Sequence, residues 1–273
     1  MQQAACGLYA FCREADDLID EGSDPQAALN ELHGRLDRIY EGNPLYLSTD
    51  RVLTQIVHSY QLPRALLDAL LEGFEWDASG RSYPDIDAVY DYSARVAGAV
   101  GVMMSVLMGV RDAPTLARAA DLGTAMQLTN IARDVLEDAH MGRRYLPATW
   151  VDGLSSGDIA KAAQTQDEAK IILVKQAVEK TINLAETYYQ SGFAGLSYLP
   201  LRPRIAIAIA AKAYRQIGIQ LRAHDLNWHE GRTVTSITNK AVQSIAALPK
   251  CLYLQPVIAH QATLHRPLEE LFS

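Results

Sequence analysis

Apolar residues recur every three to four positions along nearly the whole chain, which is the spacing of amphipathic helices. No convincing run alternates β-branched and polar residues in the way that a half-buried strand would. Prolines fall where several helices would begin, since proline is tolerated in a first turn: Pro25, Pro44, Pro63, Pro84 and Pro114. The pattern predicts helices over residues 4–21, 25–41, 48–60, 63–75, 85–109, 113–139, 166–192, 200–224 and 233–247.

The domain organisation follows from the same pattern. No internal repeat and no low-complexity linker interrupts the helices, so we expect one all-α domain over residues 1–250 and a C-terminal tail over residues 251–273. The 273 residues, 49% of them hydrophobic, are enough for a sizeable core. Two apolar stretches, residues 96–110 and 205–211, are shorter than the roughly 18 to 20 residues that a membrane span needs. We interpret them as buried helices.

The net charge indicates which class of partner the protein binds, and the cysteine content indicates its cellular compartment. The net charge of -7 argues against a nucleic-acid partner, which would favour a basic surface. Cys6, Cys12 and Cys251 form no CxxC pair, and their odd number fits the reduced thiols of a cytosolic protein. The first residues lack the basic and then apolar pattern of an export signal. These features indicate a cytoplasmic protein.

Two acidic stretches carry the strongest chemical signal. Asp16 and Asp20 are four residues apart, as are Asp134 and Asp138, so on a helix each pair lies on one face with roughly 6 Å between Cβ atoms. Such like-charged pairs are mildly destabilising in a free helix, and a divalent ion such as Mg²⁺ would compensate them. A solvated helix face is the simpler interpretation of either pair alone.

The neighbours of these aspartates favour a binding site. Leu18 and Ile19 accompany the first pair, and Ile131, Val135 and Leu136 accompany the second, and a partly buried charge must be compensated. Arg13 precedes the first pair, while Arg133 and the amides of Gln127 and Asn130 precede the second. Mg²⁺ binds through a few protein oxygens together with substrate phosphates, and arginine forks bind phosphate oxygens in pairs. The combination predicts a diphosphate site.

Residues 96–110 have a second interpretation, as the wall of a pocket for an apolar ligand. Gly98 and Gly101 leave space beside a helix, and the methionines Met103, Met104 and Met108 supply an adaptable apolar wall. A long apolar ligand would fit there. Close packing between helices explains the glycines equally well.

Three segments resemble the squalene and phytoene synthase family. Residues 92–101, YSARVAGAVG, are similar to its first signature, in which a tyrosine leads into V-A-G-x-V-G, and residues 11–20, FCREADDLID, are similar to its first aspartate motif. The resemblance covers residues 8–240. The sequences of residues 127–134 and 142–147 are most similar to those of the bacterial phytoene synthases. The long second signature is matched by Leu122, Gly123, Gln127, Asn130, Ile131, Ala132, Arg133, Asp134, Asp138, Arg143, Tyr145 and Pro147.

The resemblance implies an isoprenoid synthase fold with a central apolar pocket and a head-to-head condensation of two prenyl diphosphates. One diphosphate ionises, the double bond of the second molecule captures the carbocation, and a cyclopropyl diphosphate forms. A second ionisation and rearrangement follow. We expect two geranylgeranyl diphosphates to give phytoene by way of prephytoene diphosphate, ending in proton loss and therefore without NADPH. No Gly-rich dinucleotide fingerprint is present, which agrees weakly, since squalene synthases lack it too.

The resemblance also implies a role for each matched residue. Tyr92 and Tyr145 would lie near the carbocation, with ordinary core packing as the alternative for Tyr145. Arg133 could instead pair with a neighbouring aspartate. Mg²⁺, with Mn²⁺ as the alternative ion, would be held by Asp16, Asp20, Asn130, Asp134 and Asp138. Substrate binding would fall to Arg13, Gln127, Asn130, Arg133, Arg143, Tyr145 and Arg232.

The chain departs from the family at its beginning. Family members usually carry, before the segment matched by residues 9–13, a helix with a Ser-Phe motif that covers the pocket, whereas eight residues precede Tyr9 here. We therefore expect a domain that is short at its N-terminus, in which a missing lid would admit water to the carbocation.

Other functions and partners remain open. A synthase that uses farnesyl diphosphate to make presqualene diphosphate or dehydrosqualene is the nearest alternative, and a non-catalytic assembly factor is another. A chain-elongating prenyltransferase or a terpene cyclase shares the first aspartate motif, but residues 127–147 disfavour both. Because the substrate and product are hydrophobic, we expect peripheral contact with the inner face of the membrane. We also expect contact with other carotenoid-pathway enzymes.

Overall fold

The computed structural model describes residues 2–20, 22 and 24–231. This part of the chain is all-α and contains no strand, as the sequence predicts. None of its helices is long and apolar enough to cross a membrane. The α-helices are α1 (Gln2–Asp20), α2 (Pro25–Tyr40), α3 (Ser48–Tyr60), α4 (Arg64–Ala78), α5 (Ile86–Ser93), α6 (Ala99–Leu107), α7 (Ala113–Arg133), α8 (Val135–His140), α9 (Ser156–Thr165), α10 (Glu168–Gly195) and α11 (Leu201–Ala223).

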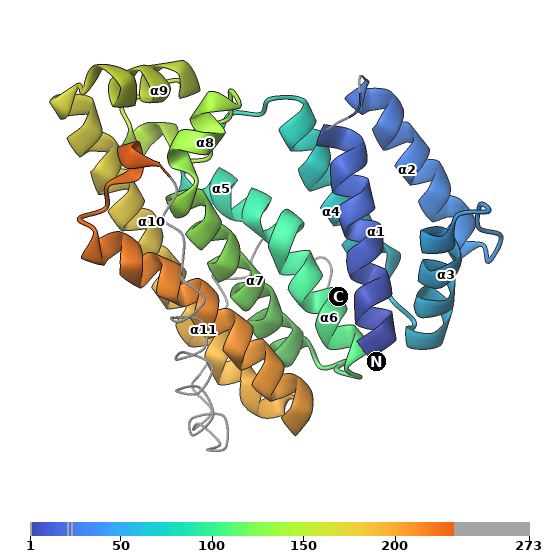
Figure 1. Cartoon of the computed structure of the whole chain (residues 1–273). Coiled ribbons are helices and arrows are strands. Elements are labelled where there is room, and N and C mark those ends of the chain that lie inside the picture. Colours follow the sequence, from blue (N-terminus) through green and yellow to red (C-terminus); the bar gives the residue numbers. More distant parts are fainter. Residues whose placement is uncertain (1, 21, 23, 232–273) are drawn as a thin grey trace.

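Helix α7 lies at the centre of the molecule. It packs against α6 on one side and against α10 and α11 on the other, while α1 packs against α2, α3 and α4 (Figure 1). Helices α1 and α7 run in the same direction, so that the acidic stretch at the end of each lies at the same end of the molecule (Figure 1). The fold thus brings two segments more than 100 residues apart to one end of a helical assembly.

Small residues set the spacing between the central helices. A Cβ atom on Gly123 would clash with the carbonyl oxygen of Ala97, and one on Gly101 would clash with the carbonyl oxygen of Ala119. On the opposite side of α7, a Cβ on Gly192 would press into Leu122. Glycine therefore allows α6, α7 and α10 to approach each other closely along the centre of the fold.

A buried ion pair fixes α1 in place. Arg35 on α2 is 3% exposed and contacts the fully buried Asp50 on α3, with 2.6 Å between Nη2 and Oδ1. The same nitrogen lies 2.7 Å from Oε1 of Glu14 on α1. A buried charge needs such partners, because an unpaired one is costly. The network therefore links α1, α2 and α3 through a single guanidinium group.

Most predicted helices are confirmed, with one exception, one helix that was not predicted and one refinement. The predicted helix over residues 113–139 is wrong at Asp134, whose φ of -100° and ψ of 16° separate α7 from α8. This turn directs α8 against α9, which the periodicity did not predict. The predicted helix over residues 85–109 is α5 and α6 joined by a π-helical turn, Ala94–Gly98. Residues 233–247 and the expected tail lie outside the described residues.

Helix α9 did carry a local signal. Ser155 caps its first turn by accepting from the backbone N–H of Asp158, and the Asp158 side chain accepts from the backbone N–H of Ser155. This reciprocal capping box is a helix-start pattern that can be recognised in a sequence.

Candidate active site

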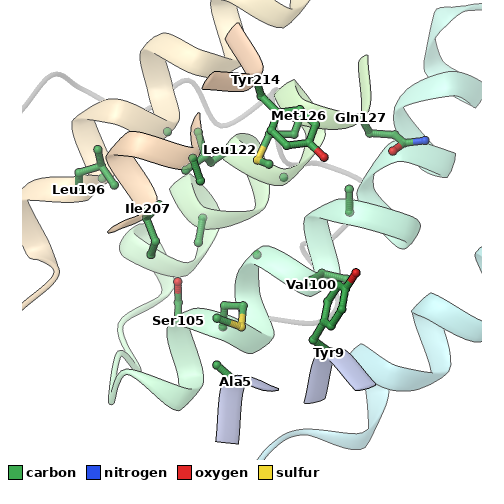
Figure 2. A pocket seen from close by; sticks show the side chains of 18 of the residues that line it. Ala5, Tyr9, Val100, Ser105, Leu122, Met126, Gln127, Leu196, Ile207 and Tyr214 are labelled. Atoms are coloured by element: carbon green, nitrogen blue, oxygen red, sulfur yellow. The ribbon is translucent and has the colours of Figure 1, made fainter. Parts of the chain in front are cut away.

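An apolar cavity of about 560 Å³ lies between α1, α6, α7, α10 and α11, as the resemblance implies (Figure 2). Ala5 and Ser105 lie at one end of it and Gln127 at the other (Figure 2). Gly101 and Met104 line the wall, so Gly101 serves both the pocket and the close helix packing. The other residues predicted for this wall do not line it: Gly98, Met103 and Met108. Its lining also includes Leu8, Tyr9, Cys12, Val96, Val100, Leu122, Met126, Asn130, Leu196, Leu199, Ile207 and Tyr214.

The polar end of the cavity points toward both acidic stretches. Gln127 and Asn130 on α7 line this end, and the Asn130 Nδ2 donates to the Gln127 Oε1 at 3.3 Å. The Asn130 Oδ1 is buried without a hydrogen-bond partner among the described residues. Asp134 follows Asn130 by about one helical turn, and Asp16 follows the lining residue Cys12 by one turn.

The first acidic stretch is half-exposed and carries its own arginine. Arg13, which is 59% exposed, lies with its Nη1 3.3 Å from the Asp16 Oδ2 and its Nη2 2.7 Å from the Asp17 Oδ1. The side chain of Asp20 and the whole of Arg232 lie outside the described part of the chain. Their predicted roles stay predictions.

The second stretch is more buried. Arg133 holds Asp134 with both arms of its guanidinium, and the Nε to Oδ1 distance is 2.7 Å. Of the two roles that the sequence left open for Arg133, the structure therefore contains the pairing with a neighbouring aspartate. Burial and the nearby charge of Asp134 raise the pKa of Asp138 to about 7, although Arg143 opposes this shift.

The predicted tyrosines are brought together by a residue that the sequence did not single out. The Asp77 carboxylate accepts from the Tyr92 hydroxyl at 2.7 Å and from the Tyr145 hydroxyl at 2.6 Å. The two rings stack, with 4.9 Å between centroids. Burial raises the pKa of both phenols, so both stay protonated and donate.

These tyrosines lie behind the apolar cavity. Tyr92 comes one turn before the lining residue Val96, while Tyr145 lines a second, polar cavity of about 270 Å³ together with Asp77 and Arg143. Tyr145 and Arg143 also line a small crevice with Asp138. The structure therefore groups Tyr92, Tyr145, Arg143 and Asp138 on the α7–α8 side, apart from Arg13 and Asp16 on α1.

The described side chains of the two acidic stretches do not form a closed metal site. Within the described part of the chain, no three histidine, cysteine, aspartate or glutamate side chains gather closely enough to hold an ion. The magnesium ligands therefore stay a prediction.

The family model for squalene/phytoene synthase matches residues 1–239. The chain is 40% identical to a phytoene synthase of Rhodobacter capsulatus, an alignment that covers 98% of this chain and 84% of that protein. It is also 40% identical to a 15-cis-phytoene synthase of a Paracoccus species, over 84% of this chain and 76% of the relative. The chain belongs to the squalene and phytoene synthase family.

Solved structures of this family have the same fold. A dehydrosqualene synthase in complex with ligand superposes with a TM-score of 0.79 at 29% identity, covering 90% of this chain and 86% of that one. A squalene synthase from Alicyclobacillus acidocaldarius superposes with a TM-score of 0.73 at 25% identity, covering 81% of this chain and 82% of that one. The all-α isoprenoid synthase fold expected from the sequence is confirmed.

Proposed function

We propose that the chain is a phytoene synthase, a prenyltransferase that joins two geranylgeranyl diphosphates head to head and releases diphosphate. The observation that carries this proposal is an apolar cavity whose polar end faces two acidic helix ends. A prenyl diphosphate has the matching shape, with a long apolar chain and a charged head. Relatives at 40% identity that are named phytoene synthase support the C20 substrate.

The chain's own residues would bind the diphosphates and protect the carbocation. Arg13 is accessible on α1, and Arg143 lies beside Tyr145 and Asp138, so each can offer a guanidinium fork to phosphate oxygens. The apolar wall of the cavity would shield the side of the cation that faces it from water, which would otherwise capture the cation. The protonated phenols of Tyr92 and Tyr145, which lie behind the cavity wall, would supply rings and dipoles on the side of the reacting carbons.

The donor set suits magnesium, with manganese as the alternative ion. The unpartnered Asn130 Oδ1 and the mutually repelling carboxylates of Asp134 and Asp138 would gain from a hard cation that binds oxygen. Asp16 and Asp20 would hold metal on the opposite wall. When bound, Mg²⁺ would neutralise the diphosphate as it leaves. Because the proposed reaction ends by proton loss, NADPH is not required.

Contact with other components follows from the substrate. A C20 diphosphate and a C40 hydrocarbon partition into lipid, so we propose peripheral contact with the inner membrane surface and with other carotenoid-pathway enzymes.

A farnesyl diphosphate-using synthase is the second candidate, favoured by the superposition on a dehydrosqualene synthase. Product analysis separates the two. The protein is incubated with Mg²⁺ and either C15 or C20 diphosphate, and the extracted hydrocarbons are identified by mass spectrometry. We expect phytoene from the C20 substrate at a higher kcat/KM than any C30 product from the C15 substrate. The reverse preference would replace this proposal with the second candidate.

A further inference from the structure

Asp77 joins three segments that are distant in the sequence. It lies in the last turn of α4, while Tyr92 lies in the last turn of α5 and Tyr145 follows α8. Its two carboxylate oxygens are divided between the two phenols, Oδ2 for Tyr92 and Oδ1 for Tyr145. Each phenol therefore has its hydroxyl hydrogen directed to a fixed point.

The surroundings of the two phenols limit their freedom further. Tyr92 is 4% exposed and Tyr145 is 8% exposed, and the buried ring of Tyr83 packs against both, at centroid distances of 5.3 Å and 5.7 Å. A hydrogen bond to a carboxylate is stronger than one between neutral groups. It also draws the phenol proton toward the acceptor, which enriches the ring in electron density. An electron-rich ring face stabilises a nearby cation more strongly.

The tyrosine pair lies behind the wall of the apolar cavity and beside the crevice of the second acidic stretch. Tyr92 is one turn from the apolar cavity wall at Val96, and Tyr145 borders the crevice that contains Asp138 and Arg143. A rotation of either ring would change the packing behind the cavity wall at Val96 and the side of the crevice that contains Asp138 and Arg143. A group that locks both rings is therefore in a position to affect the chemical step.

We propose that Asp77 is a positioning residue for the condensation, acting through the hydroxyl groups of Tyr92 and Tyr145. The inference rests on the proposed function, because it assumes that the two rings border a carbocation. A purely structural clasp between α4, α5 and the segment after α8 would have the same hydrogen bonds. The two roles predict different values of kcat when the carboxylate is neutralised in a protein that stays folded. A positioning residue lowers kcat, whereas a structural clasp leaves it unchanged.

Asp77→Asn tests the role, and Asp68→Asn is the matched control. Asp68 lies on the same helix, is 40% exposed and pairs with Arg64. We expect Asp77→Asn to lower kcat about 10-fold or more and to change KM less than about twofold, with a larger share of the cyclopropyl diphosphate released unconverted. Thermal unfolding is measured on each variant. Folded Asp77→Asn protein with the kcat and product pattern of Asp68→Asn would overturn the proposal.

A cycle of variants tests whether Asp77 acts through the phenols. Tyr92→Phe with Tyr145→Phe keeps both rings and removes both hydroxyls, so we expect a loss of kcat similar to that of Asp77→Asn. Adding Asp77→Asn to this double variant should lower kcat no further. Independent, multiplying losses would overturn the proposal. If Asp77→Asn does not fold, the double phenylalanine variant decides, because a kcat within about twofold of wild type would exclude the role.

The choice of substrate separates this inference from the proposed function. The comparison uses whichever prenyl diphosphate the wild-type protein converts faster. A preference for the C15 substrate would contradict the proposed function and leave the test of Asp77 intact. A wild-type protein that converts neither substrate would contradict both.

Discussion

At the scale of single residues, the charged groups of the site are held by neighbours on their own side. Arg13 contacts Asp16 and Asp17, and Arg133 contacts Asp134. These pairs keep each wall ordered while the acidic ends of α1 and α7 stay on opposite sides of the cavity. Substrate binding would then exchange carboxylate partners of the arginines for phosphate oxygens, which offer the same geometry.

Cys12 provides a test of how dry the polar end of the cavity is. Burial, helped by the charge of Asp16, raises the pKa of the Cys12 thiol to about 12. A raised pKa means less thiolate, and the thiolate is the reactive form. At pH 8 we expect iodoacetamide to modify the exposed Cys6 and to leave Cys12 unmodified, as read by mass spectrometry of the two peptides.

Denatured protein is the control for this labelling, because both cysteines then have ordinary pKa values and should react alike. Modification of Cys12 as fast as Cys6 in the folded protein would show that water reaches this part of the cavity.

The sequence singled out the candidate site residues better than the residues that hold them in place. Motif spacing was sufficient to single out Tyr92, Tyr145 and the aspartates, because those positions belong to extended signatures. Asp77 had no such signal. Its hydrogen bonds span 15 and 68 residues, and a contact of that kind depends on how α4, α5 and the segment after α8 pack together.

At the scale of helices, the hydrophobic periodicity predicted the continuous helices and missed the break in one of them. The residues around Asp134 have helical periodicity on both sides, so a single helix over residues 113–139 was the natural expectation. The break at Asp134 comes from tertiary packing, since α8 turns to meet α9. The Asp138 backbone N–H still donates to the Asp134 carbonyl at 2.8 Å, so the one-turn relation of these residues survives the break.

The close approach of α6 and α7 predicts opposite effects for two Gly-to-Ala changes. Gly123→Ala should lower the free energy of unfolding by about 1–3 kcal/mol, because the new methyl group would clash with the backbone near Ala97. Gly34 lies inside α2, and a Cβ atom added there would meet no other atom within 4 Å, so Gly34→Ala should raise it by about 0.5–1 kcal/mol.

Urea denaturation measures both changes. Equal effects of the two substitutions would show that helix propensity, rather than the spacing of α6 and α7, determines the stability at Gly123.

At the scale of the whole molecule, the cavity extends along α7 from its polar end to a far end. The residues that line it on α7 extend from Thr115 to Asn130, which is about 22 Å along a helix axis. Ala5 and Ser105 lie away from the polar end (Figure 2). The side chains there would therefore determine how long a prenyl chain fits once its diphosphate is bound between the acidic walls.

A larger side chain at this far end should change the preferred chain length. We expect Ala5→Phe to lower kcat/KM for the C20 substrate about 10-fold or more relative to the C15 substrate, because the added ring occupies the space of the last isoprene unit. Ala10→Phe, on the exposed side of the same helix, is the matched control and should leave the ratio unchanged. An unchanged ratio in Ala5→Phe would mean that the substrate tail lies elsewhere.

The central claim is that two acidic helix ends and one apolar cavity form a single site for a prenyl diphosphate and Mg²⁺. The most direct measurement is the hydrocarbon formed from geranylgeranyl diphosphate with Mg²⁺ and without NADPH, in parallel with a reaction that contains excess chelator. We expect phytoene in the first reaction and none in the second. Phytoene formed at the same rate in chelator, or no phytoene from folded protein in either reaction, would contradict the account.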